Sequence, residues 1–363
     1  MNRTLFPFKG RACAIALLGA ALLIIGGCSG NSPSKTASGG RGGGNAVITG
    51  AGSSFDYPLF TRAFYQYSQE HPGVSVNYQS IGSGGGIEQF TKKTVDFGAT
   101  DVPMNANELS AVDPQAAARQ LPIALGGVAV SYNVPGAPQH LSLSPAVLAA
   151  VFAGKVNNWS DPAIAKLNRG FKAASLPIVV VHRADGSGTT YIFTDYLSTV
   201  SRQWKTATGK GKTVSWSASS AMGAKGNEGV AGTIRNTPGA IGYVELSYAL
   251  QNKMPYAAIS NRFGVPVLPS LSSIGSAAAA KPGVSPSDFS IVDQPGRDSY
   301  PIAGYSWLLI YGHYPDTAKQ KAIRDLFTWM LGPGQKSAPE LNYVPLPRKV
   351  ADQAKRKLAS SAR

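Results

Sequence analysis

Three short segments combine glycine with hydroxyl side chains, and this combination can bind an oxyanion. The segments lie within residues 46–55, 74–86 and 178–190, and each places serine between a strand-like stretch and a helix-like stretch. A helix start leaves backbone N–H groups unpaired and carries a partial positive charge. Glycine lets a ligand approach the backbone and serine or threonine adds a donor, so an anion can bind there without many full charges.

A single corner of this kind is explained equally well by a glycine-rich turn that caps a helix. The chain has three such corners, and the third also contains Arg183 and Asp185. The repeated pattern therefore predicts an anion site rather than three unrelated turns.

The stretches around the corners predict an α/β fold. Residues 74–79 alternate between apolar and polar, as a strand does, and 178–181 form the apolar run of a buried strand. The stretch after the first corner has Phe60, Phe64 and Tyr67 at helical spacing. In an open α/β sheet such corners fall at the carboxyl ends of strands, where ligands bind.

Several catalytic and nucleotide-binding motifs are incomplete. Phe55 stands where the dinucleotide fingerprint needs its third glycine, and residues 206–213 start with threonine where a P-loop needs glycine. Ser187 lacks the glycines two residues away on either side that a nucleophile elbow requires. The four histidines are scattered, without metal-ligand spacing. We expect no catalytic residues, cofactor or metal, and a secreted serine hydrolase or phosphatase using Ser187 is a remote alternative.

The N-terminus has the pattern of a bacterial lipoprotein signal. Basic residues precede an apolar run at 12–25, and small residues then lead to Cys28. We expect a signal peptide over 1–27 and a flexible tether over 28–45 that carries the lipidated Cys28. An ordinary signal peptide with an incidental cysteine is the alternative. The folded part then begins near Ala46.

Length and charge narrow the class of protein. The 363 residues suffice for about two domains, and 43% hydrophobic residues allow a sizeable core. The net charge of +15 lies mostly in the signal, the tether and the tail after Pro347. A nucleic-acid binder would concentrate this charge on its folded body, so we expect no nucleic-acid partner. The basic ends could lie against anionic lipid or be simply solvated.

Six segments together resemble the phosphate-binding proteins of phosphate-specific ABC transporters, the PstS family. They occur in the family order and at similar spacings, between Thr49 and about Pro347. Each alone is a weak signal, whereas the set is specific. The segments are 49–55, 77–86, 95–101, 183–189, 226–229 and 238–245.

The resemblance implies an α/β, two-lobed periplasmic binding protein fold of type II, with two crossovers between the lobes. We place the crossings near Asn133 and Tyr305. Lobe I would then combine residues 46–132 with 305–363, and lobe II would be 133–304.

The resemblance also implies a function. The protein would bind inorganic phosphate with high affinity outside the cytoplasmic membrane, in the periplasm or at the cell surface, and deliver it to an ABC permease for import. Its partners would be the permease and ATPase subunits, and the membrane through Cys28; the protein would be a monomer. A binder of another tetrahedral oxyanion, a phosphate-responsive surface lipoprotein and an adhesin remain as alternatives.

The same resemblance implies which residues hold phosphate. Asp185 would orient Arg183 through a carboxylate–guanidinium pair. The chain departs from the family at Ser54, usually threonine, which keeps the hydroxyl, and at His182, often a second arginine, which makes the local field less positive. The implied set is Ser54, Phe55 through its backbone N–H, Ser83, Asp101, Arg183, Ser187, Gly188 and Thr189.

Asp101 carries the argument for specificity. A carboxylate that faces an anion is costly unless a proton lies between them. Phosphate and arsenate keep a proton at neutral pH and can donate it, whereas sulfate has none. We therefore expect arsenate to compete with phosphate and sulfate to be rejected, on the order of 10⁴-fold. The alternative for Asp101 is a helix cap or turn residue before Val102 and Pro103.

Overall fold

The computed structural model describes residues 46–172 and 174–360. The predicted signal peptide, the tether and Cys28 lie outside the described residues. Among the described residues, no helix has both the length and the apolar character needed to cross a bilayer.

Most strands join one eight-stranded sheet, in the order β2-β1-β3-β11-β4-β8-β6-β7. Its strands are β1 (Ala46–Gly52), β2 (Val74–Ser80), β3 (Phe97–Thr100), β4 (Arg119–Tyr132), β6 (Val179–Arg183), β7 (Met222–Ala224), β8 (Ala240–Glu245) and β11 (Ala303–Ile310). A small sheet has the order β10-β9-β5, from Pro266–Val267, Ala258–Ser260 and Ser142–Leu143. The predicted strands at 74–79 and 178–181 are thereby confirmed as β2 and β6.

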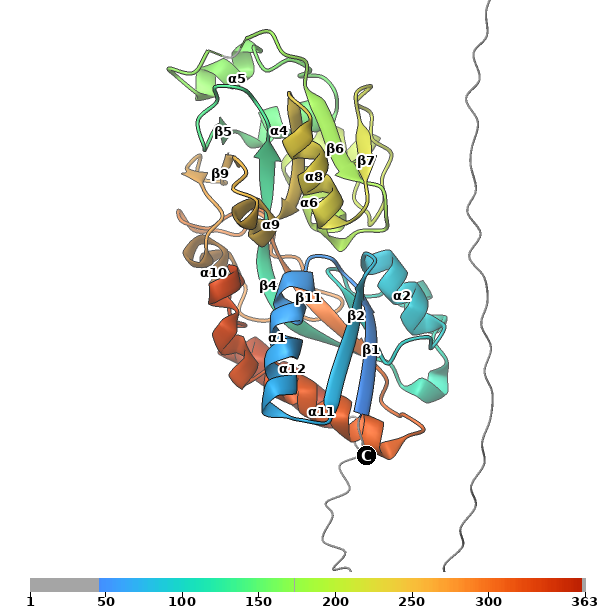
Figure 1. The fold of residues 1–363 in the computed structure, drawn as a ribbon. Coiled ribbons are helices and arrows are strands. Elements are labelled where there is room, and N and C mark those ends of the chain that lie inside the picture. The colour runs from blue at the N-terminus through green and yellow to red at the C-terminus, as the bar shows by residue number, and fades with distance from the viewer. Residues whose placement is uncertain (1–45, 173, 361–363) are drawn as a thin grey trace, which may run out of the picture. The chain divides into compact units, whose positions relative to one another are not determined.

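Strand β4 links the two halves of the large sheet. It pairs antiparallel with β11 up to Gly127 and with β8 from Val128 onward. Thirteen of its 14 residues are buried, so both of its faces are covered. Figure 1 shows β4 passing from the strands β1, β2 and β11 towards β6 and β8. The chain returns to the half of the sheet with β1, β2 and β3 in the segment that leads into β11. The assignment of residue ranges to the two lobes stays a prediction.

Helices cover both halves of this sheet. They are α1 (Tyr57–Glu70), α2 (Ser83–Thr91), α3 (Ala106–Ser110), α4 (Pro145–Phe152), α5 (Pro162–Leu167), α6 (Gly188–Val200), α7 (Arg202–Ala207), α8 (Gly226–Asn236), α9 (Leu246–Gln251), α10 (Leu271–Ala279), α11 (Thr317–Met330) and α12 (Arg348–Ala359). In α1 the predicted aromatic face is confirmed, since Phe60, Phe64 and Tyr67 are buried. Pro58 lies in the first turn, where its missing N–H costs nothing.

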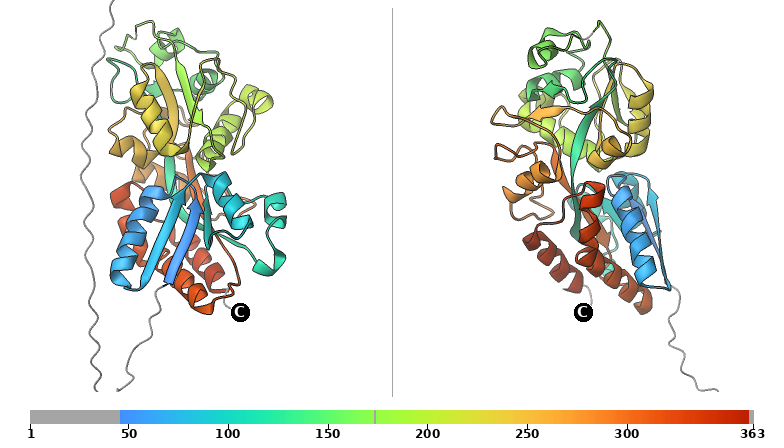
Figure 2. Two further views of the ribbon diagram at one scale, coloured as in Figure 1. Left: turned by 45° about the vertical axis from the view of Figure 1, so that its right-hand side comes forward. Right: turned by 60° about the vertical axis from the view of Figure 1, so that its left-hand side comes forward.

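The basic C-terminal tail is part of the fold rather than a free end. It forms α12, whose Val350, Ala354 and Leu358 are buried. This helix packs on β4 and beside α11 (Figure 2). Its apolar residues recur at helical spacing, so one face is buried and the basic residues stay outside.

Each glycine-serine corner connects a strand of the large sheet to a helix. The second corner differs from the expected loop, because α2 already begins at Ser83 and its glycines form the first turn. Close packing explains this: a Cβ on Gly86 would lie 2.4 Å from the Cα of Gly52. Only glycine lets the helix start so near β1.

Candidate functional site

Asp101 lies at the end of β3 and is almost fully buried, with 2% exposure. Its Oδ1 accepts hydrogen bonds from Ser53 Oγ at 2.5 Å and from Ser306 Oγ at 2.8 Å. Burial raises the pKa of Asp101 to about 6, although these two hydrogen bonds and the charge of Arg183 pull it down. Asp101 is no helix cap, because α3 begins five residues later with Asn105 as its cap. Its turn position leaves it facing the other corners.

Ser83 joins the second and third corners. Its Oγ accepts from Asp101 N at 3.2 Å and from Gly188 N at 3.1 Å. The backbones of the two corners also touch, since Gly84 N donates to Gly186 O at 2.7 Å. The start of α2 and the start of α6 therefore point at the same place, and both bring the positive end of a helix to it.

Ser187 caps α6. Its Oγ accepts from Thr190 N at 3.0 Å, so the hydroxyl holds the helix start in place. His182 does not reach this hydroxyl, because its ring stacks on Trp216 with 5.0 Å between centroids. The pair has none of the geometry of a nucleophile and its base.

Arg183 is held by Asp185 in a two-pronged ion pair. Arg183 is 5% exposed; its Nε donates to Asp185 Oδ1 at 2.8 Å and its Nη2 to Oδ2. Burial alone would raise the pKa of Asp185. The hydrogen bond and the charge of Arg183 lower this pKa by more, so it ends below its usual value. Arg183 Nη1 also reaches Thr189 Oγ1 at 3.4 Å. This pairing fixes the guanidinium plane, as the predicted role of Asp185 requires.

Ser54 meets the third corner through Asn227. Asn227 Nδ2 donates to Ser54 Oγ at 2.9 Å and to Thr189 Oγ1 at 3.2 Å. The N–H of Phe55, which we expected to face the anion, donates to Ser53 Oγ at 2.9 Å. The structure thus brings together all eight predicted residues, from the ends of β1, β3 and β6 and the starts of α2 and α6. Their role in holding a ligand stays a prediction.

Comparisons with known proteins indicate the family to which a chain with this cluster belongs. Residues 34–333 match the family model of the PBP superfamily domain. The chain is 43% identical over 309 residues to the phosphate-binding protein PstS of Xylella fastidiosa, strain 9a5c, covering 84% of this chain and 83% of that protein. It is 37% identical to the phosphate-binding protein PstS of Methanocaldococcus jannaschii, covering 97% of each. This chain belongs to the PstS family.

Solved structures agree on the fold. The phosphate-binding protein of Stenotrophomonas maltophilia aligns with a TM-score of 0.67 at 19% identity, covering 85% of this chain and 93% of that one. At this identity the likeness concerns the fold alone. The chain of this PstS-family member has the α/β, two-lobed binding-protein fold of type II that its motifs predicted.

The sequence did not single out every residue of the site in this PstS-family protein. Ser53 and Asn227 lie inside the resembling segments, so attention to each hydroxyl and amide there would have found them. Tyr248 donates to Ser54 O at 2.7 Å, and Ser306 donates to Asp101 from the middle of β11. Neither lies in a motif, and only folding brings them to the corners.

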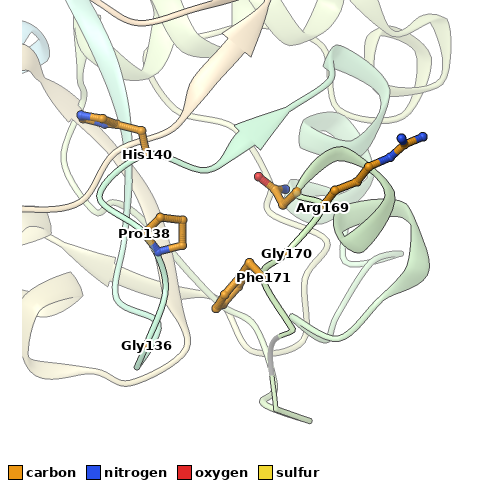
Figure 3. Close-up of a pocket in the computed structure, with 7 residues that line it drawn as sticks. Gly136, Pro138, His140, Arg169, Gly170 and Phe171 are labelled. Carbon is orange, nitrogen blue, oxygen red and sulfur yellow. The ribbon is translucent and has the colours of Figure 1, made fainter.

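A cavity on the described surface lies away from this cluster. Figure 3 shows this cavity of about 550 Å³, which is lined by Gly136, Pro138, His140, Asn168, Arg169, Gly170 and Phe171. His140 and Arg169 are exposed and point away from each other. The cavity contains no predicted site residue and has no converging polar groups.

Gly188 packs tightly against Asp101, and alanine there should weaken ligand binding. A Cβ on Gly188 would lie 2.5 Å from Asp101 Cβ and 2.6 Å from its Oδ2. Such overpacking costs about 1–3 kcal/mol, so we expect phosphate affinity to fall about 10- to 100-fold by calorimetry. Gly232→Ala in α8 is the matched control, because nothing lies within 4 Å of its added Cβ. Equal affinities of the two variants would contradict the assignment of Gly188 to the site.

Proposed function

We propose that this protein binds inorganic phosphate with high affinity outside the cytoplasmic membrane and delivers it to an ABC permease for import. The observation that carries this is the buried convergence of three glycine-serine corners on Asp101 and Arg183. The names of its relatives, phosphate-binding proteins PstS, support the choice of ligand.

Different groups of the cluster would make different contacts with phosphate. Backbone N–H groups at the starts of α2 and α6 and the neighbouring hydroxyls would donate to phosphate oxygens. Arg183 would supply the full positive charge, in a plane fixed by Asp185. Asp101 would accept the phosphate proton. Sulfate would place an oxygen without a proton against the same carboxylate, and this leaves both groups unpaired.

Contacts between the corners support a closed state of the site. Gly188 N reaches Ser83 Oγ, and Lys212 pairs with Glu108 across the two halves of the sheet. We propose that phosphate release requires these contacts to part by a hinge motion. Small-angle scattering should show compaction on adding phosphate, and an unchanged radius of gyration would argue against the hinge.

Calorimetric titration of the purified protein tests the proposed function. Phosphate should bind tightly, arsenate should displace it and sulfate should not. Comparable affinities for sulfate and phosphate would favour the alternative of a general oxyanion binder. Absence of any phosphate binding would overturn the proposal.

We also propose that Cys28 is lipidated after removal of residues 1–27, and that it anchors the protein to a membrane. The sequence pattern around Cys28 supports this. Mass spectrometry of the mature N-terminus should show an acylated Cys28, and Cys28→Ser should release the protein from the membrane fraction. A mature chain that starts at another residue would overturn the anchor.

The selectivity for phosphate should depend on pH. The pKa of Asp101 is raised to about 6, so the side chain is ionised at pH 8 and gains a proton as the pH falls through 6. A protonated Asp101 can donate to sulfate. One pH unit below the pKa, about nine-tenths of the side chains carry the proton. We expect sulfate to compete about tenfold better at pH 5 than at pH 8, measured by displacement of labelled phosphate; selectivity that stays constant over this range would contradict the role of Asp101.

A further inference from the structure

Asp56 is a buried acid that the binding scheme does not use. It occupies the N-cap position of α1, where aspartate usually accepts a hydrogen bond from the first turn. Its side chain makes no such bond and is 0% exposed. Its Oδ2 instead lies 2.5 Å from Ser306 Oγ, and its Oδ1 is buried without a partner among the described residues. Helix capping therefore does not explain this residue.

Ser306 lies between two acids. Its Oγ is 2.5 Å from Asp56 Oδ2 and 2.8 Å from Asp101 Oδ1. A hydroxyl has a single hydrogen and can donate to only one of them. The other contact needs a proton from a carboxyl group, because two oxygen atoms without a hydrogen between them repel each other at this distance. One of the two acids is thus neutral.

The surroundings decide which acid carries the proton. Asp101 accepts a second hydrogen bond from Ser53 Oγ and lies in the field of Arg183, and both favour its ionised form. Asp56 has only Ser306. The dipole of α1 favours an ionised Asp56 only modestly. Burying an unpaired carboxylate costs more than this dipole contributes, so burial outweighs the dipole.

The charges that face Asp56 act in the same direction. They come from Asp101 after β3 and, at a pH high enough to ionise it, from Glu245 at the end of β8. Tyr78 of β2 and Tyr343 are neutral neighbours, because burial raises their pKa values. Burial, then Asp101 and Glu245, raises the pKa of Asp56 well above its usual value, and the Ser306 hydrogen bond only partly offsets this. Burial likewise raises the pKa of Glu245 to about 8. Arg183, the buried cation of the site, is already paired with Asp185.

We propose that Asp56 is held as a neutral carboxylic acid that donates its proton to Ser306, which in turn donates its own to Asp101. The chain of donors runs one way, so Asp101 stays the ionised member and its Oδ1 is occupied by Ser306 and Ser53. This leaves Oδ2, the oxygen that faces Gly188, for the proton of the ligand. Asp56 is a positioning residue in this arrangement. The functional part rests on the proposed phosphate site; the protonation of Asp56 does not.

Asp56, Ser306 and Asp101 all belong to the half of the sheet that contains β1, β3 and β11. The protonation can therefore be read in ligand-free protein. Infrared spectra at pH 7.5, with aspartate carboxyl carbons labelled, should contain a protonated carboxyl band that Asp56→Asn removes. Asp325→Asn, on the surface of α11, is the control and should keep the band. Loss of only a carboxylate band in Asp56→Asn would overturn the proposal.

Unfolding gives a second readout of the same proton. At a pH above the ordinary pKa of aspartate, Asp56 carries a proton in the folded chain but not in the unfolded chain. Unfolding therefore releases one proton at Asp56, and it becomes easier as the pH rises. Between pH 5 and 7, the unfolding equilibrium constant of wild type should rise about tenfold more per pH unit than that of Asp56→Asn. Identical slopes in the two proteins would overturn the proposal.

Ligand titrations test the chain of donors. Ser306→Ala removes a donor to Asp101 and should lower the selectivity for phosphate over sulfate about tenfold at pH 7, the size expected from one lost hydrogen bond to a charged group. Asp56→Ala removes the donor that directs the Ser306 hydroxyl towards Asp101 and should lower the selectivity by a smaller factor. Asp56→Asn, whose amide N–H can donate to Ser306, should restore most of what Asp56→Ala loses. An Asp56→Asn protein that binds phosphate over tenfold more tightly than wild type at pH 8 would mean that wild-type Asp56 is ionised, and the proposal would be wrong. If wild type binds no phosphate, the proposed function falls, while the infrared and unfolding results still decide the protonation of Asp56.

Discussion

Replacing Arg183 with alanine should weaken phosphate binding by about 100-fold or more. Arg183 is the buried cation of the site, and truncating one partner of a buried, hydrogen-bonded charge pair costs about 2–5 kcal/mol. Each 1.4 kcal/mol corresponds to about tenfold in the dissociation constant. The variant also leaves Asp185 unpaired beside the ligand, so its charge repels the anion. Calorimetry at pH 8 measures the change.

Two further variants separate charge from geometry at this position. Arg183→Lys keeps the charge but loses the planar fork that pairs with Asp185, so its affinity should fall between those of wild type and alanine. Arg262→Ala is the matched control, because Arg262 is a half-exposed arginine that also pairs with an aspartate, Asp293. An Arg183→Ala protein with the affinity of the Arg262→Ala control would contradict the site.

Asp101→Asn should change which anion binds. The asparagine has nearly the shape of the aspartate, and its Oδ1 can still accept from Ser53 and Ser306. Its amide group, however, can donate to an oxygen that carries no proton. Sulfate should therefore become a competitor, and the preference for phosphate over sulfate should fall about 10²- to 10⁴-fold in displacement titrations.

The same variant should remove the pH dependence of selectivity. Without a titrating group at position 101, the competition by sulfate should be equal at pH 5 and pH 8. Thermal unfolding provides the fold control: burial raises the pKa of Asp101, which costs stability above pH 6, so Asp101→Asn should unfold at or above the wild-type temperature there. A variant that folds and still rejects sulfate would show that another group selects the ligand.

The two expected outcomes together would describe a site that binds with few charges and selects with one. In the proposed site, donors from the backbone and hydroxyls would bind any tetrahedral anion of the right size, and a single acceptor, Asp101, would reject anions without a proton. Such a site needs its carboxylate ionised, although it is buried next to other acids. Asp56 and Ser306 are placed to ensure this, because the proton that relieves the crowding of negative charge sits on Asp56.

Much of the fold could be predicted because its signals are local. The alternation in 74–79, the apolar run 178–181 and the aromatic spacing in α1 depend only on residues within one element. The start of α2 was harder, since a run of glycines favours a loop and only the close approach of β1 makes it the first turn of a helix. The tail helix α12 also needed tertiary structure, because its packing depends on contacts with β4 and α11, which are distant in the sequence.

The residues themselves predicted the three corners, their donors and the arginine beside the third, since glycine, serine and helix starts act within a few positions of each other. The site role of Asp101 was predicted only through the resemblance to the PstS family. Only the tertiary structure decided which distant residues contact these corners. Ser306 meets Asp101 across 205 positions of sequence, and Asn227 meets Ser54 across 173. Contacts this distant leave no periodicity or spacing in the chain, because their partners are chosen by the order of strands in the sheet. The protonation of Asp56 follows from such contacts, and so it too became visible only in the folded protein.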